Sequence, residues 1–147
     1  MRLPYARESG SQLYEFALIL PLLSMILVGM FFGGILLYDY VTLADAVAAG
    51  ARTLATNRGA GSGGGPTACD LATSMVESTT NTIDPQQQNL VTPLTFSFTG
   101  TSTCSTLVQG DWATLKAYYH CSVPIPFTGV NLCSAQGITS STTMRIE

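Results

Sequence analysis

Residues Phe16–Tyr38 read FALILPLLSMILVGMFFGGILLY, a run of 23 residues without a charged side chain. An α-helix rises about 1.5 Å per residue, so this run is long enough to cross a hydrocarbon core of roughly 30 Å. The alternative is a cleaved secretory signal, because Ala44-Asp45-Ala46 resembles a small-residue cleavage site. That site lies beyond the end of the run, and the run exceeds the roughly 7 to 15 apolar residues of such signals. We therefore predict a membrane span over residues 16–38.

The charges on the two sides of this run predict its orientation. Arg2 and Arg7 precede it, whereas the first charges after it belong to Asp39 and Asp45. Lys and Arg are enriched on the cytoplasmic side of membrane spans. We therefore expect a cytoplasmic N-terminus and an extracytoplasmic C-terminal region.

Composition narrows the functional class. The chain has 147 residues, of which 46% are hydrophobic and 10% are charged, whereas ordinary soluble domains carry roughly 25% charged residues. This disfavours a conventional cytosolic enzyme. The net charge is -3 with scattered Lys and Arg residues, so no basic stripe is present to bind nucleic acid.

The apolar pattern continues beyond the membrane run. Leu43, Val47, Ala51 and Leu54 follow helical spacing, which predicts one helix over residues 11–57, with a membrane part at 16–38 and an extension at 39–57. A helix of about 45 residues would be about 70 Å long, which is typical of a filament spine rather than a lone anchor. The glycine-rich stretch 58–66 should end the helix and form a hinge.

Small residues along this helix favour contact with other helices. Gly29 and Gly33 form a G-x-x-x-G motif, which lets helix backbones approach closely in lipid. The same pattern is compatible with a membrane helix that merely tolerates glycine. Pro21 should kink or locally loosen the helix. Further small residues follow in the extension, namely Ala44, Ala48, Ala49 and Ala51.

Glu15 is an ionisable residue at the edge of the apolar run. An unpaired charge at membrane depth costs on the order of 2 to 3 kcal/mol or more, so a pairing role is one interpretation. The other is a carboxylate that reaches the cytoplasmic headgroups.

The residues around Glu15 resemble a type IV prepilin processing site. Gly10-Ser11-Gln12-Leu13-Tyr14-Glu15-Phe16 places a Gly at the end of a basic leader and a Glu fifth in the mature chain. The resemblance implies that a prepilin peptidase removes residues 1–10 by cutting after Gly10. The new amino group on Ser11 would then pair with Glu15 of a neighbouring subunit.

The chain also resembles the TadE-like pseudopilins of tight-adherence (Tad/Flp) type IVb pili. The resemblance lies in EFALILP at 15–21, AAGARTLA at 48–55 and ITSSTTMRIE at 138–147. It implies a single-pass protein of the bacterial inner membrane that forms homo-oligomers through N-terminal helices and contacts other pilins and the pilus assembly machinery. Major pilins of these systems are much shorter, so the chain is more similar to the minor subunits.

The region 67–147 is expected to form a small α+β domain. Thr67 and Asp70 have capping-box spacing before a helix that should end near Asn81. Alternating apolar and polar residues predict three antiparallel strands. These cover Leu94–Thr99, Trp112–Val123 and Ile138–Ile146.

Four cysteines, Cys69, Cys104, Cys121 and Cys133, lie in this region. An even number at wide spacing in an exported domain is typical of disulfides, here favoured as Cys121–Cys133 and Cys69–Cys104, although sequence does not fix connectivity. Metal binding is the alternative, but the single His120 merely adjoins Cys121 and short ligand spacings are absent.

No catalytic or cofactor site is predicted. His120 is the one imidazole available as a base, and strand parity turns it away from Cys121. The glycine run lacks the Lys-Ser/Thr of a phosphate loop. Trp112, Tyr118 and Tyr119 are compatible either with a contact surface or with packing. We expect no enzyme activity, no metal and no cofactor.

Two functional hypotheses follow. The first is a structural subunit, a pilin or minor pseudopilin, of a bacterial surface filament that assembles through the N-terminal helix. The alternative is a membrane-anchored scaffold or binding module of a pilus assembly or secretion apparatus that does not polymerise.

Overall fold

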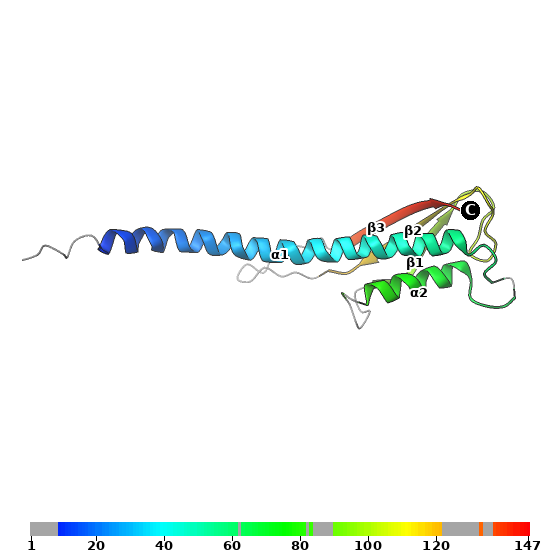
Figure 1. Ribbon diagram of the computed structural model, residues 1–147, viewed down its shortest axis with the longest axis horizontal. Coiled ribbons are helices and arrows are strands. Elements are labelled where there is room, and N and C mark those ends of the chain that lie inside the picture. The colour runs from blue at the N-terminus through cyan, green and yellow to red at the C-terminus, as the bar shows by residue number, and fades with distance from the viewer. Residues whose placement is uncertain (1–8, 62, 82, 84–89, 122–132, 134–136) are drawn as a thin grey trace, which may run out of the picture. The chain divides into compact units, whose positions relative to one another are not determined.

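The computed structural model describes residues 9–61, 63–81, 83, 90–121, 133 and 137–147. These residues form an α+β fold, as expected from the sequence (Figure 1). The chain divides into two compact units, residues 1–37 and residues 38–147. Its elements in chain order are α1 (Ser9–Thr56), α2 (Ala68–Thr80), β1 (Leu90–Phe98), β2 (Trp112–Tyr119) and β3 (Ile138–Arg145).

Helix α1 is uninterrupted from Ser9 to Thr56. Pro21 lies inside it without ending it, although proline supplies no N–H to the helical ladder. The hydroxyl of Ser24 donates a hydrogen bond to the Pro21 carbonyl at 2.8 Å. The expected long helix is therefore present, and the proline does not divide it.

Helix α2 begins at the predicted capping box. Thr67 is the N-cap: its hydroxyl accepts from the Asp70 N–H at 3.3 Å, while its own backbone N–H donates to Asp70 Oδ2 at 2.8 Å. Each contact pairs a backbone N–H that has no intrahelical partner at the start of a helix. The helix ends at Asn81, the C-cap, where the sequence predicted its end.

The three strands form one antiparallel sheet in the order β1-β2-β3. Strand β1 begins at Leu90, four residues before the predicted start at Leu94, and its register shifts between Val91 and Thr95. Pro93 lies in this irregular part. An edge strand tolerates proline there because the missing N–H interrupts no pairing inside the sheet.

Strand β2 ends at Tyr119, earlier than the predicted end at Val123, which lies outside the described residues. At this end Gly137, which precedes β3 and has a φ of +73°, passes against the Tyr119 carbonyl. A Cβ at position 137 would collide with that carbonyl oxygen. The close approach requires glycine.

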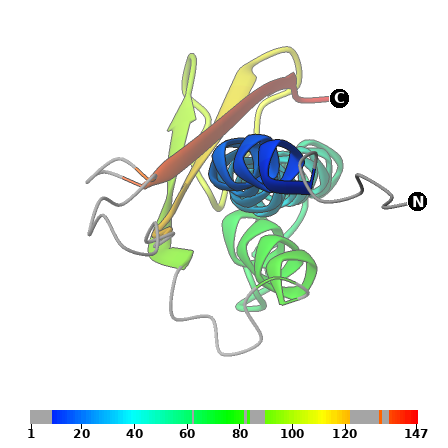
Figure 2. The same ribbon diagram turned by 90° about the vertical axis from the view of Figure 1, so that its left-hand side faces the viewer.

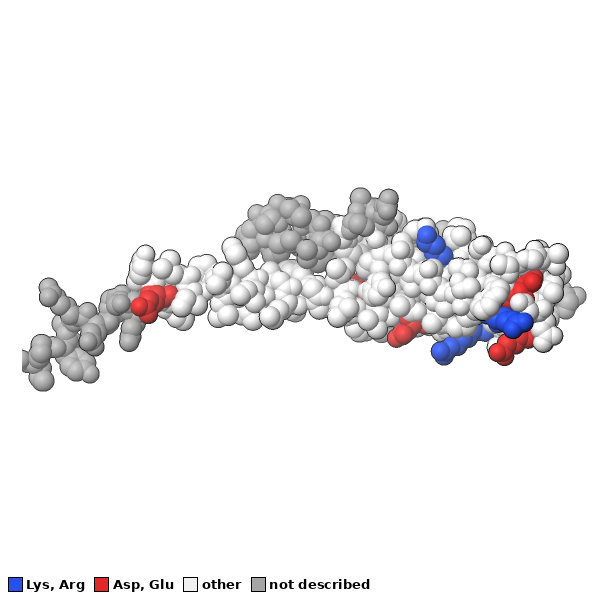
Figure 3. Space-filling view, turned by 90° about the horizontal axis from the view of Figure 1, so that it is seen from above, with Lys and Arg blue, Asp and Glu red and all other residues white. Residues whose placement is uncertain are grey.

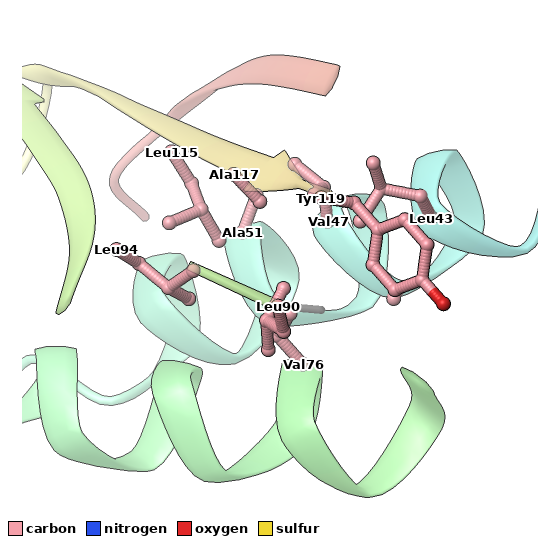
Figure 4. Packing of buried hydrophobic residues seen from close by; sticks show 10 residues of the cluster. Leu43, Val47, Ala51, Val76, Leu90, Leu94, Leu115, Ala117 and Tyr119 are labelled. Carbon is pink, nitrogen blue, oxygen red and sulfur yellow. The ribbon is translucent and has the colours of Figure 1, made fainter. Parts of the chain in front are cut away.

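Within the second unit, both helices lie on one face of the sheet (Figure 2). Residues 38–56 of α1 supply one side of the core and Val76 of α2 supplies another (Figure 4). The alternation predicted for β2 is confirmed, since its inward side chains are the buried ones. The main cluster contains Leu43, Val47, Ala51, Val76, Leu90, Leu94, Leu115, Ala117 and Tyr119.

This core corrects one interpretation of the sequence. Ala51, counted above among the small residues available for other helices, is 1% exposed and packs inside its own chain. Gly50 lies close to α2 and to β2: a Cβ there would be 2.6 Å from Val76 Cγ2 and 2.9 Å from Leu115 Cδ2. The extension of α1 is therefore a core element of the second unit.

The other face of the sheet is lined with hydroxyl groups. Thr114 and Thr143 share a cross-strand hydrogen bond of 2.8 Å, and Lys116 Nζ lies 4.9 Å from the centre of the Tyr118 ring. Pairing register places further Ser and Thr residues on this face, namely Thr95, Ser97, Thr139 and Ser141.

Two disulfides connect the elements of the second unit. Cys69 of α2 bonds Cys104, and Cys121 after β2 bonds Cys133. These are the pairings favoured from the sequence. The Ala68 N–H also donates to the Cys104 carbonyl at 3.2 Å, so the start of α2 is joined to the loop between β1 and β2 by a covalent bond and a hydrogen bond.

Candidate assembly surface

The first unit exposes an almost continuous apolar surface on α1. Its large hydrophobic side chains between Leu13 and Leu37 include Met25, 74% exposed, and Leu13, 71% exposed. Soluble monomers rarely expose apolar patches above a few hundred Å². This part of α1 therefore requires lipid or other protein around it.

The helix is long and apolar enough to cross a membrane. Tyrosines stand at both ends of the apolar run: Tyr14 before it, and Tyr38 and Tyr40 at its end, each at least half exposed. Aromatic residues of this kind concentrate at membrane–water interfaces. The charged residues alone limited the span predicted from the sequence, and the tyrosines are a further sequence signal for its two ends.

Glu15, Gly29 and Gly33 share one side of α1. Glu15 and Gly33 are 18 residues apart, and at 3.6 residues per turn that separation is five whole turns. A Cβ at Gly29 or Gly33 would meet no atom within 4 Å. The two glycines thus leave a shallow strip open to a neighbouring helix.

The Glu15 carboxylate is exposed at the beginning of the apolar segment and has no hydrogen-bond or ion-pair partner among the described residues. The sequence offered two interpretations, pairing with another subunit or contact with headgroups. Both place the partner of Glu15 outside its own chain.

The predicted processing residues lie at the beginning of the same helix. Gly10 and Ser11 belong to the first turn of α1. Arg2 and Arg7, the charges of the predicted leader, lie outside the described residues.

The residues considered from the sequence for catalysis, metal binding or surface contact do not form one site among the described residues. His120 is exposed, and the described part of the chain contains no group of three or more His, Cys, Asp or Glu residues placed to hold a metal. Trp112 is 49% exposed whereas Tyr119 is 4% exposed, so the aromatic residues near β2 do not form one contact surface.

Outside the membrane segment, the pKa of Asp70 is shifted by hydrogen bonds within its own helix cap. Hydrogen bonds from the Thr67 backbone N–H and then from its hydroxyl lower the pKa of Asp70 below its ordinary value of 3.8. This is the effect expected for a carboxylate that accepts hydrogen bonds in its charged form. It marks a helix cap, and in the part of the chain that the structure describes no group of three or more His, Cys, Asp or Glu residues that could hold a metal accompanies it.

Comparison with known families identifies the segment that carries these features. Residues 10–52 match the family model described as TadE-like protein. This segment is similar to TadE-like proteins, and the match covers less than half of the chain. The match begins at Gly10 and includes Glu15, both glycines of the exposed strip and the first part of the α1 extension. No curated protein and no solved structure matches the chain.

Similarity to the TadE-like family, which is generally non-enzymatic, indicates a component associated with the Tad pilus. The same family similarity indicates association with the membrane and with other pilus components. The part of the second unit after residue 52 is outside the matched segment, so what this part contributes has to be argued from its own residues.

Proposed function

We propose that this TadE-like protein is a structural subunit, a pilin or minor pseudopilin, of a Tad-type surface filament, and that it assembles by packing its N-terminal helix against those of neighbouring subunits. The observation that carries the proposal is the first unit itself. It leaves an apolar helix face exposed, and that face holds an unpartnered carboxylate at one end and an open glycine strip farther along.

Each of these features is satisfied by an adjacent helix. Close approach at Gly29 and Gly33 allows dispersion contacts between backbones, which drive helix association where no hydrophobic force operates. Cleavage after Gly10 would create a cationic amino group on Ser11. That group is the natural partner for Glu15 of another copy, because a charge buried in an apolar bundle requires an opposite charge.

The second unit supports an extracytoplasmic location. It contains two disulfides, Cys69–Cys104 and Cys121–Cys133. Disulfides persist in oxidising compartments and are rare in the cytosol. Together with Arg2 and Arg7 before the span, this favours a cytoplasmic N-terminus and an exported domain in a protein of the bacterial inner membrane.

The proposed function has no catalytic step. All four cysteines are in disulfides, and the described residues contain no group of three or more His, Cys, Asp or Glu residues placed to hold a metal. The role that we propose is one of binding and assembly.

The experiment is intact-mass and N-terminal analysis of the protein in material sheared from the cell surface, compared with the membrane fraction. We expect a filament-associated form that begins at Ser11. Gly10→Val should block processing and assembly, while the adjacent Ser9→Ala variant should be processed normally. A protein found only in the membrane, as an unprocessed monomer, would indicate the scaffold alternative.

A further inference from the structure

The extension of α1 buries one side and leaves the opposite side uncovered. Leu43, Val47 and Leu54 are fully buried, whereas Asp45 and Arg52 are exposed. At 3.6 residues per turn, Asp45 and Arg52 lie within about 20° of each other around the helix and on the side opposite Val47. The sheet and α2 pack elsewhere on the extension (Figure 2).

Four residues spaced by four, three and four positions define this uncovered side, which we call the outer stripe: Val41, Asp45, Ala48 and Arg52. Val41 is 48% exposed, and Ala48 is partly buried. Such spacing is the pattern of a seam between two helices. The stripe thus has an apolar pair as well as an acidic and a basic residue.

The two charges of the outer stripe do not satisfy each other within the chain. Asp45 and Arg52 are seven residues apart, which is about 10.5 Å along the axis and beyond ion-pair distance. Neither charged side chain has a hydrogen-bond or ion-pair partner among the described residues. The stripe therefore presents complementary charges at a fixed spacing to whatever lies against it.

We propose that the outer stripe binds the same stripe of a second copy of this chain, parallel to it and displaced by seven residues. In this register Asp45 of one copy pairs with Arg52 of the next, and Val41 packs against Ala48. The inference rests on the proposed function, since it specifies how subunits contact one another outside the membrane.

Charge selects the displacement. Two parallel copies at equal depth place Asp45 beside Asp45 and Arg52 beside Arg52, and like charges on adjacent helices repel. An antiparallel pair would also join opposite charges, but it would direct the two apolar segments in opposite directions. Subunits anchored in the same membrane have the same direction. The favourable contact consequently forms when one subunit is displaced by seven residues along the helix axis relative to its neighbour.

Cysteine crosslinking of the full-length protein in cells tests this register. The double variant Asp45→Cys/Arg52→Cys is oxidised in intact filaments, sheared from the surface and analysed on non-reducing gels. Because each subunit would join one neighbour through position 45 and another through position 52, we expect a ladder of dimers, trimers and longer species. Mass spectrometry should identify the peptide that links position 45 to position 52.

A matched control keeps the first site and moves the second. Asp45→Cys/Thr56→Cys uses another exposed position on the same side of α1, eleven residues away, and should give no ladder. Equal crosslinking of the two pairs, or dimers alone, would overturn the proposed register even with filaments present. Absence of the protein from sheared material would instead overturn the proposed function, and this inference with it.

Charge variants provide a second measurement that does not depend on cysteine chemistry. Asp45→Arg and Arg52→Asp should each reduce the amount of sheared protein several-fold, and the double variant should restore it. Both side chains are exposed, so the fold of the monomer should be unaffected. No recovery in the double variant would contradict direct pairing of the two residues.

Discussion

Thr67 and Asp70 cap each other across the first turn of α2, with the Thr67 N–H and hydroxyl both 2.8 Å from Asp70 Oδ2. Thr67→Ala removes the hydroxyl that accepts from the Asp70 N–H and should lower the free energy of unfolding by about 1 kcal/mol. Chemical denaturation of the full-length protein in detergent measures this. Thr67→Ser keeps the hydroxyl and should retain most of the stability.

The same pair predicts a pH dependence. Because the pKa of Asp70 is lower in the folded protein than its ordinary value of 3.8, the charged cap stabilises the fold fully above about pH 4, and the stabilisation declines as the pH falls through the folded value. Asp70→Asn should flatten this part of the stability profile. An unchanged acid profile in Asp70→Asn would show that other carboxylates dominate it.

Gly50→Ala should destabilise the second unit despite the better helix propensity of alanine. The new methyl group would lie 2.6 Å from Val76 Cγ2 and 3.1 Å from the Ala72 carbonyl oxygen. Overpacking of this kind costs about 1 to 3 kcal/mol, against a propensity gain of about 1 kcal/mol. The double variant Gly50→Ala/Val76→Ala should recover stability relative to the sum of the single variants, and a simply additive cycle would refute the contact.

Loss of the two disulfides should have unequal effects. They close segments with sequence separations of 35 for Cys69–Cys104 and 12 for Cys121–Cys133. The chain-entropy model gives about 4 kcal/mol for the longer loop and about 3 kcal/mol for the shorter one. Paired Cys→Ser variants, compared by denaturation with the parent protein, should show the larger loss for Cys69–Cys104, where Cys69 is also buried.

Glu15→Gln should reduce the protein in sheared filaments by about a hundredfold, because breaking a buried ion pair costs about 3 kcal/mol. Quantitative immunoblotting of sheared and membrane fractions measures it. Glu15→Asp, which keeps the charge, should recover part of the assembly. Glu147→Gln removes an exposed acid outside α1 and serves as the control. Equal losses in the Glu15→Gln and Glu147→Gln variants would argue against a specific pairing role for Glu15.

Gly29→Leu and Gly33→Leu should block close helix contact while leaving the monomer folded. A Cβ at either position meets nothing within 4 Å in the chain, and the same holds for Gly34. Gly34 lies about 100° around the helix from Gly33, so Gly34→Leu is a matched control on another side. Filament yield should fall for the first two variants alone. The same loss in Gly34→Leu would indicate a general effect of bulk in the helix.

Local patterns predicted most of the elements. The Thr67/Asp70 spacing located the start of α2 because the capping box is formed by residues three positions apart. Alternation located β2 and β3 because each has one face that is less exposed than the other. The start of β1 at Leu90 was missed, since Pro93 and the register shift obscure the two-residue period there.

The partner of a helix face is harder to predict than the face itself. The spacing of Leu43, Val47 and Ala51 correctly indicated one apolar side, but periodicity does not specify whether that side meets the same chain or another. The structure places this side in the core of the second unit. For Glu15 and Gly33 the sequence identified the residues, and the structure added that helical geometry aligns them on one side.

The outer face of the sheet carries many hydroxyl groups and few charged side chains. Figure 3 shows that much of the visible described surface is uncharged, and the whole chain has only 10% charged residues. Hydroxyl groups hold water without a counterion atmosphere, so salt screening, which acts within about 10 Å at 0.1 M, acts on this face through Lys116 and Arg145, which the pairing register places beside the hydroxyl groups. Sensitivity of this face to salinity should therefore arise from these two cations, while the hydroxyl groups themselves remain wetted in the same way in fresh water and in brine.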